Sequence, residues 1–385
     1  MNSRRIPWYY LEWSIKPDGS LFRRDDQLAE GVAGVNGWQG VEIVSPVLLA
    51  NRDGLNEVLH VIEFIRNNFW IDTPRSAGFH IHVGNGDDWF PTRSLRQIGS
   101  LLYGTDPILA QLHPPHRREN YMFAPSNRYL SNVSFGTKID QLDQHPQVED
   151  ELQEQPSGPV RPWWNFWSRS DAATRQAQQE EILEERQRGN HPPRPRETAY
   201  KIALHHILCQ SVLQRNSQRL GVLFDPQTYN PIPMGEAISV LLEAPNRDAV
   251  AQLLKVGSHR AAYNFDSHLF ERFMKRTIEF RQPASTTDSA TILCQISIAL
   301  RLCSVCLTED YGDLVKISAD CSVAEYNPSY YDVYDLLLDL HLIPEARLVG
   351  AISNPAVNVD EAGQDYLRSI GLVQTSGIAS LLFAR

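Results

Sequence analysis

Three short segments with the alternation of β-strands each carry, on one face, side chains that could do chemistry. The segments are 40–46, 76–84 and 276–283, and in each the intervening positions are apolar, so the polar side chains must share the opposite face. The residues concerned are Glu42 in the first segment, His80 and His82 in the second, and Glu279 and Arg281 in the third. Two carboxylates, two imidazoles and a guanidinium are costly to bury unless they pair or bind metal. A cation together with a phosphate would satisfy them all, because carboxylates and imidazole ligate metal and arginine grips phosphate oxygens.

Taken singly, each of these patterns is ambiguous. A lone His-x-His is more often structural than metal-binding, and a lone Glu-x-Arg on a strand is usually an ion-paired surface. Their joint occurrence, with glycine and proline at the strand ends, favours a functional site over three unrelated surfaces. The adjacent pair His205-His206 is different, since neighbouring side chains diverge, and is interpreted as structural.

Hydrophobic periodicity predicts the elements that would position these side chains. Strands are expected over 8–15, 40–44, 78–83, 262–265 and 276–281, and helices over 53–69, from about 94, 198–220, 247–257, 267–274 and from 288. The predicted turns between them include Lys16-Pro17-Asp18-Gly19-Ser20 and Gly84-Asn85-Gly86.

Composition divides the 385-residue chain. The stretch 141–197 is rich in Gln, Glu, Arg and Pro and carries Trp163, Trp164 and Trp167, which buries too little apolar surface to fold alone. It is predicted to be a surface insertion, partly disordered, with one solvated helix, and its tryptophans dock on the body or on a partner. The predicted organisation is 1–140 and 198–328 as two parts of one catalytic domain, 141–197 as the insertion and 329–385 as a helical tail.

Bulk properties exclude some classes of protein. The net charge of −10 argues against nonspecific nucleic-acid binding, which needs a basic surface. Five cysteines in so long a chain do not form a disulfide framework, and Cys303-x-x-Cys306 lies in an apolar helical run as core residues. No signal peptide and no run of about 18 apolar residues is found, so no membrane span is expected and the cytosol is the predicted location.

The motifs also resemble a family. Gly78-Phe79-His80-Ile81-His82 resembles the Gly-x-His-x-His strand of glutamine synthetases and glutamate–cysteine ligases, and Ile278-Glu279-Phe280-Arg281 resembles their later Glu-x-Arg strand. Together with the segment 40–46, they look like the fungal-type amidoligase family over roughly 8–310, the insertion excluded. The resemblance implies an α+β fold, with a curved, mainly antiparallel sheet whose outer face is covered by helices and whose inner face is a funnel for ATP and metal.

Residue roles follow from that resemblance. It implies Glu42, His80 and Glu279 as ligands of Mg²⁺ or Mn²⁺, His82 as a nucleotide-facing residue and Arg281 as a clamp on phosphate. Arg118, one of two adjacent arginines after a Pro-Pro turn, is a candidate for binding an acidic substrate. The implied reaction transfers the ATP γ-phosphoryl group to a small-molecule or peptide carboxylate, and an amine then displaces phosphate to give an amide. Such ligases would serve peptide modification or secondary metabolism. The acid, the amine, the general base and the oligomeric state are left open.

One departure and two alternatives stay open. Relatives begin with a Gly-x-Glu-x-Glu strand, and the first ten residues here contain no acid, so we expect either a truncated chain or a protein that has lost metal ligands. The first alternative is therefore a catalytically impaired relative that acts as a binding protein. The second is a metal-dependent amidohydrolase, which also uses His-x-His but needs later histidines and a terminal Asp on a parallel barrel.

Overall fold

The structure is a computed structural model. It describes residues 11–19, 21, 39–118, 123–142, 172–188, 230–257, 260–269, 275–308, 311–354 and 356–372. The predicted helix 198–220 with His205-His206, most of the predicted helix 267–274 and the three tryptophans of the insertion lie outside the described residues.

Helices form most of the described structure. The α-helices are α1 (Arg52–Asn68), α2 (Thr92–Leu109), α3 (Pro115–Arg118), α4 (Asn127–Leu130), α5 (Ala172–Arg188), α8 (Met234–Leu242), α9 (Arg247–Leu254), α10 (Ser289–Thr308), α11 (Tyr311–Tyr326), α12 (Val333–Asp339), α13 (Ile343–Ile352) and α14 (Val359–Ser369). Short 3₁₀ turns are η3 (Ala110–Leu112), η4 (Val133–Phe135), η5 (Ile139–Gln141) and η8 (Asp266–His268). The predicted helices 53–69, 94 onward, 247–257 and 288 onward are confirmed within a few residues at each end.

Local sequence explains several of the helix starts. The side chains of Asn51 and Asn246 accept hydrogen bonds from backbone N–H groups in the first turns of α1 and α9. Asp332 caps α12, and the Asp335 side chain bonds back to the cap backbone. These side chains satisfy N–H groups that have no partner within the helix.

The strands form two separate antiparallel sheets. β1 (Ser14–Pro17) pairs with β2 (Val41–Val44), and β5 (Thr277–Phe280) lies between β3 (Ile81–Gly84) and β4 (Tyr263–Asn264). The prediction of a mixed α+β fold with antiparallel strands is confirmed. The prediction of one curved sheet is not, because the described strands divide between these two small sheets. All pairings between the described strands are antiparallel, unlike those of the parallel barrel of amidohydrolases.

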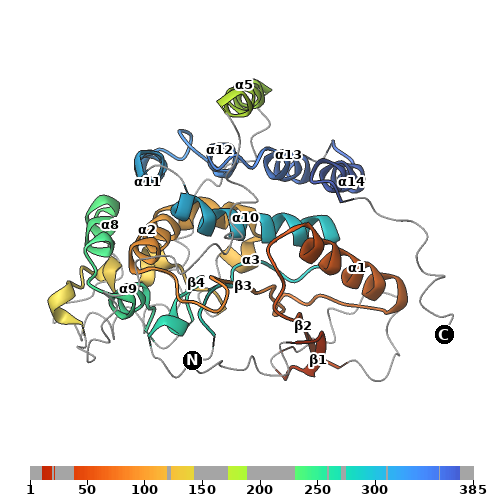
Figure 1. Ribbon diagram of the computed structural model, residues 1–385, viewed down its shortest axis with the longest axis horizontal. Coiled ribbons are helices and arrows are strands. Elements are labelled where there is room, and N and C mark those ends of the chain that lie inside the picture. The colour runs from red at the N-terminus through yellow and green to blue at the C-terminus, as the bar shows by residue number, and fades with distance from the viewer. Residues whose placement is uncertain are drawn as a thin grey trace.

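The helices cover the three-stranded sheet in layers (Figure 1). α2 and α10 lie next to β3 and β4, and α11 to α14 form an outer row beyond them. α8 and α9 pack on α2, and α1 packs on α10. The sheet therefore has one face toward the helices.

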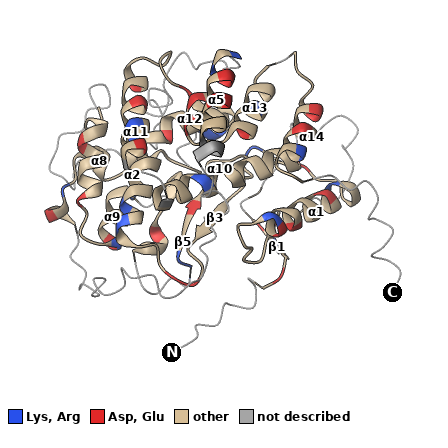
Figure 2. Ribbon diagram, turned by 45° about the horizontal axis from the view of Figure 1, so that its top comes forward, with Lys and Arg blue, Asp and Glu red and all other residues tan. Residues whose placement is uncertain are grey.

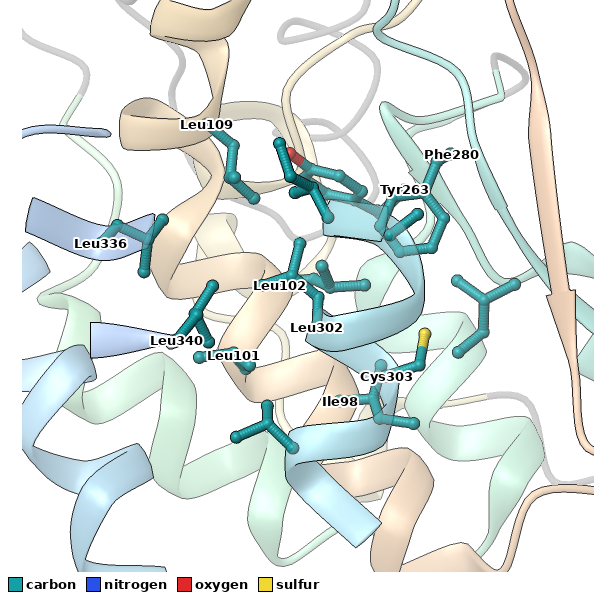
Figure 3. Packing of buried hydrophobic residues seen from close by; sticks show 14 of the residues in the cluster. Ile98, Leu101, Leu102, Leu109, Tyr263, Phe280, Leu302, Cys303, Leu336 and Leu340 are labelled. Carbon is teal, nitrogen blue, oxygen red and sulfur yellow. The ribbon is translucent and has the colours of Figure 1, made fainter. Parts of the chain in front are cut away.

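The core lies between that face and the helices (Figure 3). Tyr263 and Phe280, from neighbouring strands, meet edge to face with ring centroids 5.5 Å apart, and Leu302 of α10 lies near them. The other labelled core residues are Ile98, Leu101, Leu102 and Leu109 of α2, Cys303 of α10, Leu336 of α12, and Leu340, which directly follows α12. Cys303 and Cys306 are buried and free, so their interpretation as core residues is confirmed.

α10 corrects one statement made from the sequence. Its stretch Ser289–Leu307 has a mean hydropathy of 1.9 and is long and apolar enough to cross a membrane, although no such run was expected. Because 78% of that stretch is buried inside the protein, α10 is the central core helix of a folded domain.

α5 lies within the predicted insertion and packs against the C-terminal helices. Its Ile182 and Glu185 are buried, and Glu185 accepts hydrogen bonds from Arg347 and from the hydroxyl of Tyr334. One face of α5 is therefore fixed to the body of the protein, while most of its other described side chains are exposed.

Candidate functional site

Strand pairing brings four of the predicted residues to one face of the three-stranded sheet. His82 on β3 and Asn264 on β4 are both in register with Glu279 on the central strand β5. Residues directly opposite in antiparallel strands share a face, so Glu279 lies between them. His80 and Arg281 lie just outside the paired strands, next to the same carboxylate.

The Glu279 carboxylate is the centre of this cluster. Its Oε1 lies 2.5 Å from Arg281 Nη1, 3.6 Å from His80 Nδ1 and 3.7 Å from His82 Nε2. Its Oε2 accepts a hydrogen bond from Asn264 Nδ2 at 2.8 Å. The imidazole side chains are each 33% exposed, whereas that of Glu279 is 8% exposed. The carboxylate therefore lies buried at the bottom of the cluster, and the two imidazoles lie at its solvent-facing rim.

Burial and nearby positive charge keep both imidazoles neutral. Burial is the main cause that lowers the pKa of His80 to about 4, and the charge of Arg281 lowers it further, while Glu279 opposes both. Burial followed by the charge of Lys275 lowers the pKa of His82 to about 4. Neutral imidazoles at physiological pH have a lone pair available for a ligand.

Glu279 stays ionised for the opposite reason. Burial alone would raise its pKa, but Arg281 first and then His82, with the hydrogen bond from Asn264, bring the pKa below its ordinary value. The ion pair with Arg281 thus decides the charge state of the carboxylate.

The cluster has more positive than negative charge. Arg117, Arg260, Lys275 and Arg281 all lie close enough to lower the pKa of one or both histidines, whereas the charge of Glu279 raises both. Asp266 is a second nearby acid, and burial raises its pKa. In a chain with a net charge of −10, this local excess of cations favours an anionic ligand.

The remaining predicted residues lie elsewhere. Glu42 is exposed on β2, in register with Lys16 of β1, and Figure 2 shows β1 beside α1 and away from β3 and β5. Arg118 ends α3 and is half-buried, next to the fully buried Arg117. The structure therefore does not bring Glu42 to the other four residues, because its strand belongs to the second sheet.

The described side chains do not form a metal centre with three ligands. In the parts of the chain that the structure describes, no three His, Cys, Asp or Glu side chains are arranged to hold one ion. Both oxygens of Glu279 already accept hydrogen bonds, from Arg281 and from Asn264. What these side chains can do by themselves is present positive charge and hydrogen-bond donors to an anion.

Sequence reasoning missed three residues that support the cluster: Arg117, Asn264 and Gln282. Arg117 was considered only as the neighbour of Arg118, and nothing in the sequence distinguishes the two. Asn264 did carry a signal, because it is a polar residue between Tyr263 and Phe265 in a predicted strand. Gln282 follows Arg281 directly, and only the folded chain shows that its side chain turns into the core.

Comparison with known proteins supports a family relationship over part of the chain. Residues 7–153 match the family described as "Putative amidoligase enzyme". The match includes Glu42, His80, His82, Arg117 and Arg118, and it ends before β5. No curated protein and no solved structure matches the chain.

Proposed function

We propose that this chain, whose residues 7–153 match the family described as "Putative amidoligase enzyme", is an ATP-dependent ligase that joins a carboxylate to an amine. The observation that carries the proposal is the cluster around Glu279, which joins the His-x-His strand inside the family match to the Glu-x-Arg strand outside it. Two motifs 195 residues apart contact each other through the hydrogen bond between His82 Nδ1 and the Thr277 hydroxyl.

The reaction would proceed in two steps. A carboxylate oxygen of the acid attacks the γ-phosphorus of ATP and the bond to the β-phosphate oxygen breaks, which gives an acyl phosphate and ADP. The nitrogen of the amine then attacks the acyl carbon, inorganic phosphate leaves with the bonding electron pair, and the amine loses a proton. Both steps move negative charge between oxygens, so positioning and charge complementarity are what the protein has to supply.

Each residue of the cluster has a place in that scheme. Arg281 offers its guanidinium to phosphate oxygens, and Glu279 orients it through the 2.5 Å ion pair. His82, neutral and held by Thr277, would face the nucleotide, and His80 would face the transferred phosphoryl group. Neutral imidazoles do not compete with Arg281 for the anion, and each can donate one hydrogen bond.

Dependence on Mg²⁺ or Mn²⁺ is proposed from the family resemblance alone, as are the cytosolic location and a role in peptide modification or secondary metabolism. The described residues do not supply three metal ligands, so the proposed roles of Glu42, His80 and Glu279 as ligands need a direct test. Calorimetric titration with ATP, with and without Mg²⁺, provides it.

A screen for ADP release tests the function. The full chain is incubated with ATP, Mg²⁺ and pairs of amino acids and small amines. The proposal expects ADP and amide in equal amounts for at least one pair, and loss of both in Arg281→Lys and Glu279→Gln. Arg368→Gln, which removes an exposed ion pair with Asp365 on α14, serves as the control and keeps the activity. Absence of ADP from every pair, in a chain that also binds no ATP, refutes the proposal.

One observation favours a second candidate, a related protein that binds the ligand but does not react. Glu42 lies in a different sheet from the cluster, and both oxygens of Glu279 are already hydrogen-bonded. Binding of ATP without any ADP release would select this candidate over the ligase.

A further inference from the structure

The strand pairing around Arg281 is irregular. Between Ile81–Phe280 and Gly84–Thr277 the register of β3 and β5 is constant, but the next bridge joins Gly78 to Ala284. From Ile81 to Gly78 the chain advances three residues, whereas from Phe280 to Ala284 it advances four. The β5 side thus has one extra residue, which is a β-bulge between Phe280 and Ala284.

Bulges leave backbone groups without hydrogen-bond partners in the β-ladder. Here the side chain of Arg117 supplies the missing hydrogen bonds. Arg117 Nη2 donates to the carbonyl oxygen of Arg281 at 2.7 Å, and Arg117 Nε donates to that of Gln282 at 3.1 Å. On the other side of the strand, the N–H of Arg281 donates to the carbonyl of Ala262. One guanidinium from α3 thus satisfies two consecutive carbonyls that the irregular ladder leaves unpaired.

The bulge is also fixed from the core side. The Gln282 side chain accepts a hydrogen bond from the hydroxyl of Tyr263 at 3.0 Å, and it donates to Asp106 at 3.4 Å. Gln282 is 2% exposed. Arg281 therefore projects from a segment that is held on two sides.

Arg117 has no counter-ion in the part of the chain that the structure describes. It is 1% exposed, and none of the ion pairs among the described residues joins it to a carboxylate. Burial, and after it the nearby positive charge of Arg281, lowers the pKa of Arg117 to about 10, so Arg117 is still charged at neutral pH. Arg281 is paired with Glu279, and the positive charge of Arg117 is not balanced by an ion pair among the described residues.

Arg281 has an unused donor as well. Its Nε–H is buried and has no hydrogen-bond partner among the described residues, while its Nη1 donates to Glu279. A buried donor without an acceptor and a buried charge without a counter-charge are both unfavourable, and the oxygen of a bound anion would relieve both.

We propose that Arg117 is a positioning residue that fixes the bulge and thereby aims Arg281, and that Arg281, aided by the additional positive charge of Arg117, forms a subsite for an oxyanion at this edge of the sheet. The ligand class is a phosphate or carboxylate group. This inference rests on the proposed function, since it names the residue on which anion binding by the same cluster depends. Arg117 acts through Arg281 and through its charge, without touching the ligand.

Calorimetric titration of the full chain tests the proposal with two probes, tripolyphosphate and succinate. Binding of tripolyphosphate alone assigns the subsite to nucleotide phosphates, and binding of succinate alone assigns it to the acid substrate. Arg117→Lys keeps the charge but cannot bond two carbonyls at once. We therefore expect it to weaken, at least tenfold, the binding of whichever probe the wild type binds. Arg301→Lys is the matched control, because Arg301 is also a buried arginine that donates to a backbone carbonyl, that of Leu340, and it keeps the wild-type affinity.

A second readout separates positioning from general stability. The NMR signal of the Arg281 Nε–H is expected to shift on addition of the probe in the wild type and in Arg301→Lys, and to stay unchanged in Arg117→Lys. If Arg117→Lys binds the probe with wild-type affinity, or if Arg301→Lys loses as much affinity as Arg117→Lys, the role of Arg117 is overturned and the proposed function still stands. Failure of the wild-type chain to bind either probe overturns the subsite and removes the support for the proposed function.

Discussion

Gly78→Ala is the substitution that probes the cluster with the smallest chemical change. A Cβ at this position would lie 2.8 Å from Arg117 Nη2 and 3.1 Å from His80 Nε2. Gly78 is not among the residues with positive φ, so the backbone itself accepts alanine. The effect must come from the two side chains that the methyl group displaces.

The magnitude follows from what Arg117 would lose. The guanidinium is buried and cannot move away without weakening its 2.7 Å hydrogen bond to the carbonyl of Arg281. A hydrogen bond to a charged group contributes about 1.5–3 kcal/mol, and a methyl group gains about 0.4–1 kcal/mol by restricting the unfolded chain. Gly78→Ala should therefore lower the free energy of unfolding by about 1–2 kcal/mol and weaken anion binding, because Arg281 loses its support.

The change in the free energy of unfolding is measured by urea unfolding of the wild type, of Gly78→Ala and of a control substitution at another glycine. Gly235, at the start of α8, has no atom within 4 Å of its would-be Cβ, so Gly235→Ala should be neutral or up to about 1 kcal/mol more stable than the wild type. If Gly78→Ala is as stable as Gly235→Ala and binds tripolyphosphate like the wild type, the close approach of Arg117 and His80 over Gly78 is refuted.

Three further substitutions test the polar interior. Glu325→Gln leaves Arg128, which is 2% exposed and bonded to Glu325 at 2.7 and 3.0 Å, without its counter-charge, so thermal or urea unfolding should show a loss of about 3–5 kcal/mol; a loss below about 1 kcal/mol would contradict this. Burial raises the pKa of Asp106 to about 6, so between pH 4 and 6 the native state binds a proton that the unfolded state does not, and the free energy of unfolding falls as pH rises through that window. Asp106→Asn should flatten this part of the plot of unfolding free energy against pH, and an unchanged slope would contradict the raised pKa. Both ring nitrogens of His268 are buried without hydrogen-bond partners among the described residues, and burial lowers the pKa of His268 to about 3. The free energy of unfolding therefore decreases as pH falls from about 6.5 toward 3. His268→Phe should add about 1–3 kcal/mol at neutral pH and reduce this acid sensitivity, and a less stable variant would show that the ring nitrogens do have partners.

The sequence was sufficient to predict which side chains of β3 and β5 share a face. Alternation placed His82 and Glu279 opposite their apolar neighbours, and in the structure Ile81 and Phe280 are indeed buried while the polar pair shares the other face. That result needs only the twofold period of a strand and the burial of apolar side chains.

Strand partners could not be predicted in the same way. Glu42 has the correct alternation, but which strand β2 joins depends on long-range packing, and β2 pairs with β1. Alternation gives the face of a strand within its own sheet and contains no information on which sheet that is.

The register shift at the bulge was equally inaccessible. It depends on Arg117, which comes from a helix more than 160 residues earlier in the chain, and on the burial of Gln282 between Tyr263 and Asp106. Arg117 and Arg118 are identical in type, and only the direction of the helix end decides which one enters the core. The candidate assigned from sequence, Arg118, stays a prediction.

The most direct measurement is a crystal structure of the full chain with a non-hydrolysable ATP analogue. The account predicts that phosphate oxygens lie within hydrogen-bond distance of Arg281, on the face of the sheet that carries His80, His82 and Glu279, with Arg117 still bonded to the carbonyls of Arg281 and Gln282. An analogue bound elsewhere on the protein, with the Arg281 Nε–H still unpartnered, would contradict it.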